Sequence, residues 1–259
     1  MSTSQTATAT RAQHLNLDLP EGLARVTVRP DAVVPTITIH TDDDQGAAAD
    51  AVRGVRWREE GDTLTVTVPR SPGTTMSFTG GRGVTVIQNF GTVAAGTTVV
   101  GMTIGAGGRV TFGGGSGQII SPVVADIVLP PHGAMAFRTS SADLEARGAM
   151  LGLAVDSSSG DIQAESVEIL AVETSSGDVT VGRVGDSLQV KTSSGDVRIG
   201  AYEGTLARIH ASSGDVTFRA MPRSNGPLDI RTSSGDIRVT GADHLQLSTR
   251  TSSGDVRRR

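Results

Sequence analysis

The residues of this chain that could do chemistry are aspartates that recur at the end of one short phrase, SSGD. The phrase occurs six times, and SSAD at Ala142 is a degenerate first copy. A column of carboxylates could hold calcium between repeats, or could supply the acid and base of a glycan-cleaving enzyme. The aspartates of the seven copies are Asp143, Asp161, Asp178, Asp196, Asp215, Asp236 and Asp255.

Two features of the phrase favour a structural role for these carboxylates. The phrase never varies after its first copy, whereas an active site would break a repeat locally. The nonapeptide repeats that bind calcium carry several glycines and an aspartate every nine residues, and that pattern is absent here. We therefore expect no catalytic residue, no metal and no cofactor. Aspartate and serine are expected to bond to nearby backbone N–H groups, with the carboxylates turned toward water.

Other chemistry finds little support in the composition. The chain has no cysteine, which excludes a thiol nucleophile, a disulfide scaffold and a cysteine-ligated metal. The five histidines are scattered singly, and neither HExxH nor GxSxG occurs. The net charge is −4, and basic residues cluster only at Arg257, Arg258 and Arg259. Because a basic stripe interleaved with aromatics is missing, we expect no nucleic-acid partner.

The elements that must position the aspartates follow from the spacing of the phrase. Its glycines are separated by 17 to 21 residues, and on both sides of each glycine apolar residues alternate with polar ones. This period of two predicts two half-buried strands per repeat, joined at a corner where glycine can take a positive φ. The predicted corner glycines are Gly160, Gly177, Gly195, Gly214, Gly235 and Gly254.

A unit of about 19 residues has too little apolar surface to fold alone, so neighbouring units must stack. The predicted fold class is therefore all-β: a β-solenoid of about seven rungs over residues 133–259. A β-sandwich of regularly spaced short strands is the alternative. The solenoid is favoured because identical corners are expected where like residues lie above like.

The rest of the chain divides into three predicted segments. Residues 1–12 read as a disordered tail, because they are rich in Ser, Thr and Ala. Residues 13–79 read as an N-terminal β segment of five strands (HLNLDL, ARVTVR, PTITIH, VRWRE and TLTVTV) with one short helix after Asp42, Asp43 and Asp44. Residues 80–132 are glycine-rich and read as irregular β rungs leading into the repeats. Whether the N-terminal segment is a separate domain stays open.

The N-terminus shows no basic stretch followed by an apolar one, and no apolar run approaches the roughly 18 residues of a membrane helix. We expect a cytoplasmic protein without membrane insertion. Export to the cell surface by an unrecognised route is the alternative.

The TSSGDV and TSSGDI copies, preceded by the segment ADAVRGVRWREEGDTLTVTVP, resemble the bacterial putative-adhesin β-strand-repeat (toastrack) family. The resemblance runs from about His14 to Val256. It implies a single-handed solenoid, like a right-handed parallel β-helix, with no known catalytic residues. It also implies a place beside membrane-embedded modules of envelope-stress or regulatory systems.

The function predicted from these observations is a non-catalytic scaffold or interaction module that binds a protein partner or another copy of itself. The sequence stops half a rung after its last corner, so Arg257, Arg258 and Arg259 are expected either to guard a strand edge or to lie where a partner completes it. A cell-surface adhesin or carbohydrate-binding module is the alternative, although exposed aromatics for sugar stacking are few. A polysaccharide-cleaving β-helix enzyme is the remote alternative.

Overall fold

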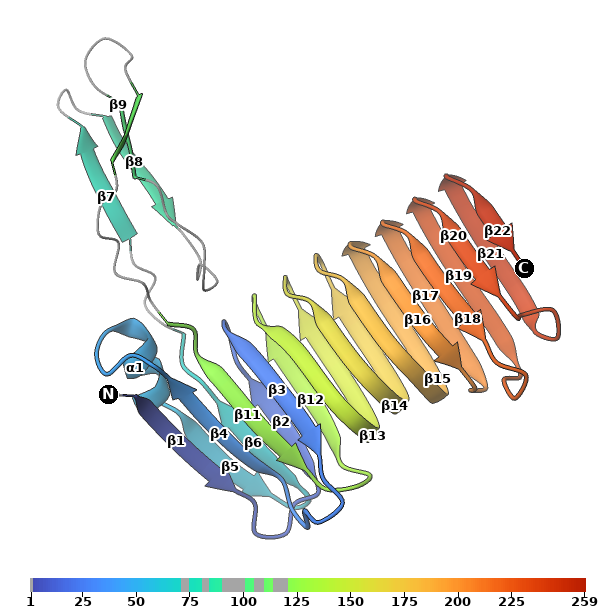
Figure 1. Cartoon of the computed structure of the whole chain (residues 1–259), viewed down its shortest axis with the longest axis horizontal. Coiled ribbons are helices and arrows are strands. Elements are labelled where there is room, and N and C mark those ends of the chain that lie inside the picture. The colour runs from blue at the N-terminus through green and yellow to red at the C-terminus, as the bar shows by residue number, and fades with distance from the viewer. Residues whose placement is uncertain (1, 71–74, 81–83, 90–100, 105–109, 114–120) are drawn as a thin grey trace.

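The computed structural model describes residues 2–70, 75–80, 84–89, 101–104, 110–113 and 121–259. Its main body is a row of β rungs that follow one another along the long axis of the molecule (Figure 1). The N-terminal strands lie at one end of the row, and the C-terminal strands lie at the other. Among the described residues, no helix is long and apolar enough to cross a membrane.

Each rung contributes one strand before its corner and one after it, and the two sets of strands form two layers. The repeat region runs through β12 (Ala134–Thr139), β13 (Asp143–Ser157), β14 (Ile162–Thr174), β15 (Val179–Ser194), β16 (Val197–Tyr202), β17 (Leu206–Ser213), β18 (Val216–Ala220), β19 (Pro227–Ser234), β20 (Ile237–Thr240), β21 (Gln246–Ser253) and β22 (Val256–Arg258). We call the layer before the corners layer A and the layer after them layer B. The long strands β13, β14 and β15 bend and belong to both layers.

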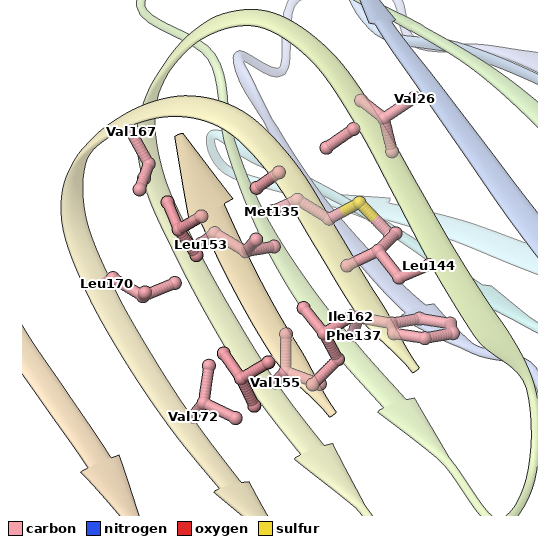
Figure 2. Packing of buried hydrophobic residues seen from close by; sticks show 14 of the residues in the cluster. Val26, Met135, Phe137, Leu144, Leu153, Val155, Ile162, Val167, Leu170 and Val172 are labelled. Atoms are coloured by element: carbon pink, nitrogen blue, oxygen red, sulfur yellow. The ribbon is translucent and has the colours of Figure 1, made fainter. Parts of the chain in front are cut away.

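Successive rungs pair in parallel, and the register places equivalent residues side by side. Leu153 lies opposite Leu170, which in turn lies opposite Leu188. Side chains from both layers point toward one another between the layers, as Figure 2 shows for Phe137 and Ile162. Parallel pairing from rung to rung confirms the predicted β-solenoid, and the β-sandwich alternative is wrong.

The N-terminal strands extend the same two layers. They are β1 (Thr3–Thr8), β2 (His14–Asp18), β3 (Leu23–Val28), β4 (Thr36–Thr41), β5 (Arg56–Glu60) and β6 (Thr63–Thr67). In layer A, β2 lies between β12 and β6, and β5 follows β6. In layer B, β11 (Val124–Leu129) joins β3 to β4, and β1 follows β4. All five strands predicted in this segment are present, and hydrogen bonds make them continuous with the rungs.

The prediction of a disordered tail at residues 1–12 is wrong. Strand β1 pairs antiparallel with β4 over its whole length, and Ala7, Ala9 and Ala12 are buried. Threonine and alanine made this segment look like low-complexity sequence. Threonine is nevertheless a good strand former, and the small apolar side chains fit against the core at the edge of layer B.

The predicted rungs over residues 80–132 are only partly present. Strand β7 (Thr75–Gly80) pairs with β8 (Val84–Asn89), and β9 (Gly101–Ile104) pairs with β10 (Val110–Gly113), in two antiparallel sheets of their own. The prediction is wrong for these strands, because connections of three and five glycine-rich residues favour pairing with the chain neighbour. Strand β11 does join the stack. The rest of this glycine-rich segment lies outside the described residues.

The short helix predicted after the acidic triplet is α1 (Ala47–Arg53). The triplet does not cap it, since Gly46 is the N-cap residue and no side chain bonds there. Asp43 instead accepts hydrogen bonds from the backbone N–H and the hydroxyl of Ser121, at 2.9 and 3.0 Å. Glu59 on β5 binds the β1–β2 connection in the same way. It accepts three backbone N–H groups, those of Thr10, Arg11 and Ala12, and these lower the pKa of Glu59 to about 2.

The single tyrosine of the chain allows the packing between the layers to be tested. Tyr202 is buried against Phe218, with ring centroids 5.2 Å apart. Burial raises the pKa of Tyr202 to about 12, against a smaller opposing effect of the Leu206 backbone. The stability that the neutral phenol contributes is therefore complete below pH 10 and is lost as the pH rises from about 10 toward 12. We expect tyrosinate absorbance to appear near pH 12 in the folded protein and near pH 10 in urea. Ionisation near pH 10 in the folded state would contradict the buried position.

Candidate functional site

The corners of the rungs form a straight ridge between the two layers. Each corner glycine has a φ between +117° and +133°, and its backbone packs directly on the preceding corner. A Cβ at Gly195 would lie 2.2 Å from the carbonyl oxygen of Gly177, and the same separation recurs at Gly214, Gly235 and Gly254. Glycine is therefore required twice at each corner, for its backbone conformation and for the close approach of the rungs.

The repeated aspartates bond between rungs, not within their own turn. In every pair of neighbouring corners, the carboxylate Oδ1 of one aspartate accepts the backbone N–H of the aspartate in the next rung. The six distances are 2.8–2.9 Å, from Asp143 and Asp161 to Asp236 and Asp255. We call this chain of bonds the aspartate ladder. It satisfies a backbone donor at each corner and offsets the repulsion between carboxylates on adjacent rungs.

A column of buried hydroxyls lies three residues before the corner glycines. Ser157, Thr174, Thr192 and Thr232 each donate a hydrogen bond to the carbonyl oxygen two residues further on, at 2.8–3.0 Å. The degenerate first copy differs, since the Thr139 hydroxyl accepts the N–H of Ala142 at 2.7 Å. Ala142 accordingly has no positive φ. The polar groups of the phrase are thus engaged mainly in shaping the corner.

Neither a metal centre nor a histidine cluster is formed by the residues that the structure describes. The histidines lie apart, and four of the five lie beside one acidic or hydroxyl group. His40 Nε2 lies 2.9 Å from Asp126, His210 Nε2 lies 3.6 Å from Asp229, and His244 Nε2 lies 3.1 Å from the Ser224 hydroxyl. The ladder aspartates stand one per rung along the ridge, so they do not converge on one point.

An open groove of about 660 Å³ runs beside the ridge on layer A. Four rungs line it, and each contributes a charged or titratable side chain, a buried residue and an exposed serine. The buried residue belongs to the hydroxyl column in the first three rungs and is Ala211 in the fourth. Along the groove the titratable side chains are Asp156, Glu173, Lys191 and His210. The exposed serines are Ser158, Ser175, Ser193 and Ser212. We call this feature the serine groove.

The arginines singled out at the end of the sequence have different surroundings. Arg257 points outward and pairs with Asp255 at 3.3 Å. Arg258 occupies a column that is otherwise apolar in most rungs, and its guanidinium donates a hydrogen bond to the hydroxyl of Thr249. Arg259 continues the pairing beside β20, since its N–H donates to the Val239 carbonyl at 3.0 Å. The last described rung therefore has a polar outer surface.

Two features escaped the sequence reasoning. Gly22 has a φ of +122° and lies in the corner column, where its carbonyl accepts the N–H of Asp143. The surrounding residues 20–23 read PEGL and not SSGD, so only the positive φ shows that Gly22 is equivalent to the corner glycines. Arg183 bridges three rungs through Glu168 at 2.9 Å and Glu203 at 2.8 Å, and these hydrogen bonds raise its pKa. The two glutamates lie 15 and 20 residues from Arg183 in the sequence, so no local pattern indicated these ion pairs.

Parallel rungs with stacked Gly-Asp corners define the chain as a β-solenoid repeat protein. Its sequence belongs to the Toastrack DUF4097 family, whose model matches residues 16–259. No curated protein matches the chain.

The fold is shared with a solved structure, a putative adhesin from Bacteroides fragilis. The TM-score is 0.57 at 14% identity, and the match covers 100% of this chain and 97% of that one. A putative adhesin from Parabacteroides distasonis (TM-score 0.43, 11% identity, covering 100% and 97%) is also similar. So is a putative lipid binding protein from the same species (0.41, 14% identity, covering 99% and 97%).

The stacking of the corners predicts which glycines cannot be replaced. We expect Gly195→Ala to lower the free energy of unfolding by at least about 2 kcal/mol, because alanine at positive φ is strained and its Cβ would overlap the Gly177 carbonyl. Gly152→Ala is the matched control. A Cβ there would meet the Ala134 methyl at an ordinary 3.4 Å, so we expect a change of about 0.5 kcal/mol or less. Equal destabilisation in urea titrations would contradict the stacking argument.

The aspartate ladder predicts a difference between two substitutions of one residue. Asp215 makes no ion pair among the described residues, and its Oδ1 accepts the Asp236 N–H at 2.8 Å. Asp215→Ala removes this acceptor and should lower the free energy of unfolding by about 1 kcal/mol. Asp215→Asn keeps an acceptor oxygen and should retain most of the stability. If the two variants melted alike, the ladder bond would contribute nothing measurable.

Proposed function

We propose that this protein is a non-catalytic interaction module, a rigid rod that binds other macromolecules through the outward side chains of its rungs. The proposal is supported by the different roles of the inward and outward columns of side chains. Inward side chains fill the core, the ladder aspartates bond the rungs to each other, and the buried hydroxyls bond within their own corners. The outward columns vary from rung to rung and carry most of the exposed charge. A link to envelope-stress or regulatory systems is part of the proposal and rests on the family resemblance.

The serine groove supports a second copy of the chain as one partner. Its titratable side chains read acid, acid, base, base along the rod: Asp156, Glu173, Lys191, His210. This order is self-complementary under a two-fold axis, because an antiparallel copy would place Glu173 opposite Lys191 and Asp156 opposite His210. A contact of this kind is isologous, the commonest arrangement in soluble dimers. Within one copy, Lys191 Nζ lies 3.8 Å from Glu173, a loose pair that can exchange partners.

Charge reversal at the groove tests this function. In analytical ultracentrifugation at low salt, we expect Glu173→Lys to weaken dimerisation by roughly tenfold, because Lys191 then faces a like charge. The double variant Glu173→Lys with Lys191→Glu restores a complementary order and should recover the dimer. Arg208→Glu is the control, since Arg208 is exposed on layer A but does not line the groove. A wild-type chain that stays monomeric at every concentration would overturn self-association, as would a swapped variant that is not rescued.

Recognition of an acidic saccharide is the second candidate function. It is favoured by the arginines on the outer surface of layer B, on the other side of the ridge from the serine groove.

A further inference from the structure

The outer surface of layer B changes character along the rod. Its last four rungs contain β16, β18, β20 and β22. The outward positions of these strands, together with the residue after β22, hold either arginine or a threonine or glycine. These positions are Arg198, Gly200, Thr217, Arg219, Arg238, Thr240, Arg257 and Arg259. None of the eight is acidic, aliphatic or aromatic. We call the five arginines and their neighbours the arginine face.

Three of these arginines have no ion-pair partner among the described residues: Arg219, Arg238 and Arg259. Arg198 pairs with Asp196 at 2.6 Å and Asp178 at 3.5 Å, and Arg257 pairs with Asp255. The surplus of positive charge is part of a wider asymmetry. Residues 191–259 hold 11 Lys and Arg against 7 Asp and Glu, whereas residues 1–190 hold 12 against 20.

The arginines occupy two columns, and over the first three of these rungs they alternate between them. Arg198 and Arg238 stand in one column, separated by Thr217, and Arg219 stands in the neighbouring column beside Thr240. The last rung holds an arginine in both columns, since Arg257 lies opposite Arg238 and Arg259 follows it by two residues. Each of the four rungs therefore presents at least one guanidinium, and rungs lie about 4.8 Å apart. The sheet fixes this pattern before any ligand arrives, which reduces the entropy lost on binding.

We propose that the arginine face binds a linear acidic polysaccharide that lies along the rod axis. An extended uronic-acid polymer carries one carboxylate per sugar and can present successive carboxylates on alternating sides of its chain, which matches the alternation of Arg198, Arg219 and Arg238. A guanidinium can bind a carboxylate through two parallel hydrogen bonds. Because the face has no aromatic or apolar side chain, recognition depends on charge and hydrogen bonds and not on stacking of the sugar rings.

The surroundings of the face argue against a planar anionic surface. The earlier rungs of layer B present Glu145 and Glu165 at outward positions. A membrane lying along the layer would meet both, whereas a polymer confined to the last four rungs meets neither. The proposal rests on the second candidate function, which it makes specific, and does not depend on self-association through the serine groove. It uses the other layer, so its failure would leave the serine-groove experiment unaffected.

Binding of a fluorescently labelled polygalacturonate oligomer, followed by anisotropy at low salt, tests the proposal. We expect saturable binding that weakens as salt is added. The double variant Arg219→Glu with Arg238→Glu should weaken it by roughly tenfold or more. Arg208→Glu with Arg250→Glu is the matched control, since both arginines are exposed on layer A, make no ion pair among the described residues and give the same change in net charge. This control should bind like the wild type. Arg219→Gln with Arg238→Gln should give an intermediate loss.

The same experiment has outcomes that overturn the proposal. Equal loss in the two charge-reversal variants would show attraction to net charge only. Equal binding of the methyl-esterified oligomer, which lacks the carboxylates, would exclude recognition of acid groups. Binding to phosphatidylglycerol vesicles or to oligothymidylate without binding to polygalacturonate would assign the face to a membrane or a nucleic acid.

Discussion

The structure depends on how closely one corner approaches the next. The backbone of each corner glycine packs on the carbonyl of the preceding corner residue, at a separation that leaves no room for a Cβ. At the same place, the carboxylate of one aspartate binds the N–H of the aspartate in the next rung. These two contacts fix the height and the register of the rungs together. The stacking of leucine on leucine and of valine on valine inside the body follows from that register.

This constraint decides which positions are available for function. The carboxylates that most resemble catalytic or metal-binding groups are engaged in the ladder, and the hydroxyls beside them bond to the corner carbonyls. The outward columns are not needed for the contacts between rungs, because replacing an exposed side chain on a fixed sheet costs little stability. Charged side chains at the outward positions can therefore vary without disturbing the fold. The serine groove and the arginine face are two such charged surfaces, on opposite sides of the same ridge.

The repeated half of the molecule could be predicted well from the sequence. Each corner carries the same SSGD phrase, and each strand shows apolar residues that alternate with polar ones. The five N-terminal strands and the short helix were equally visible. Three features were hidden for physical reasons. Strand β1 is held by pairing with β4 and not by its own composition. Gly22 stacks like the other corners without their phrase, and the ladder joins residues 17 to 21 positions apart, so no local pattern reveals its direction.

The ladder also bears on what the arginine face can bind. Asp196, Asp215, Asp236 and Asp255 stand at the edge of layer B where the arginines begin, and two of them pair with Arg198 and Arg257. Arg238 stands in the same column as Arg198 and Arg257 but makes no ion pair among the described residues, and Arg219 lies in the next column away from the ridge, as does the position of Arg259. The surplus of positive charge is therefore greatest around these three arginines. A bound polyanion would be repelled by the carboxylates on its ridge side and attracted on the other. Both effects align it with the rod, because the repelling and the attracting groups each repeat along that axis. The same rung spacing thus sets the geometry of the core, of the ladder and of the surface that a linear ligand would meet.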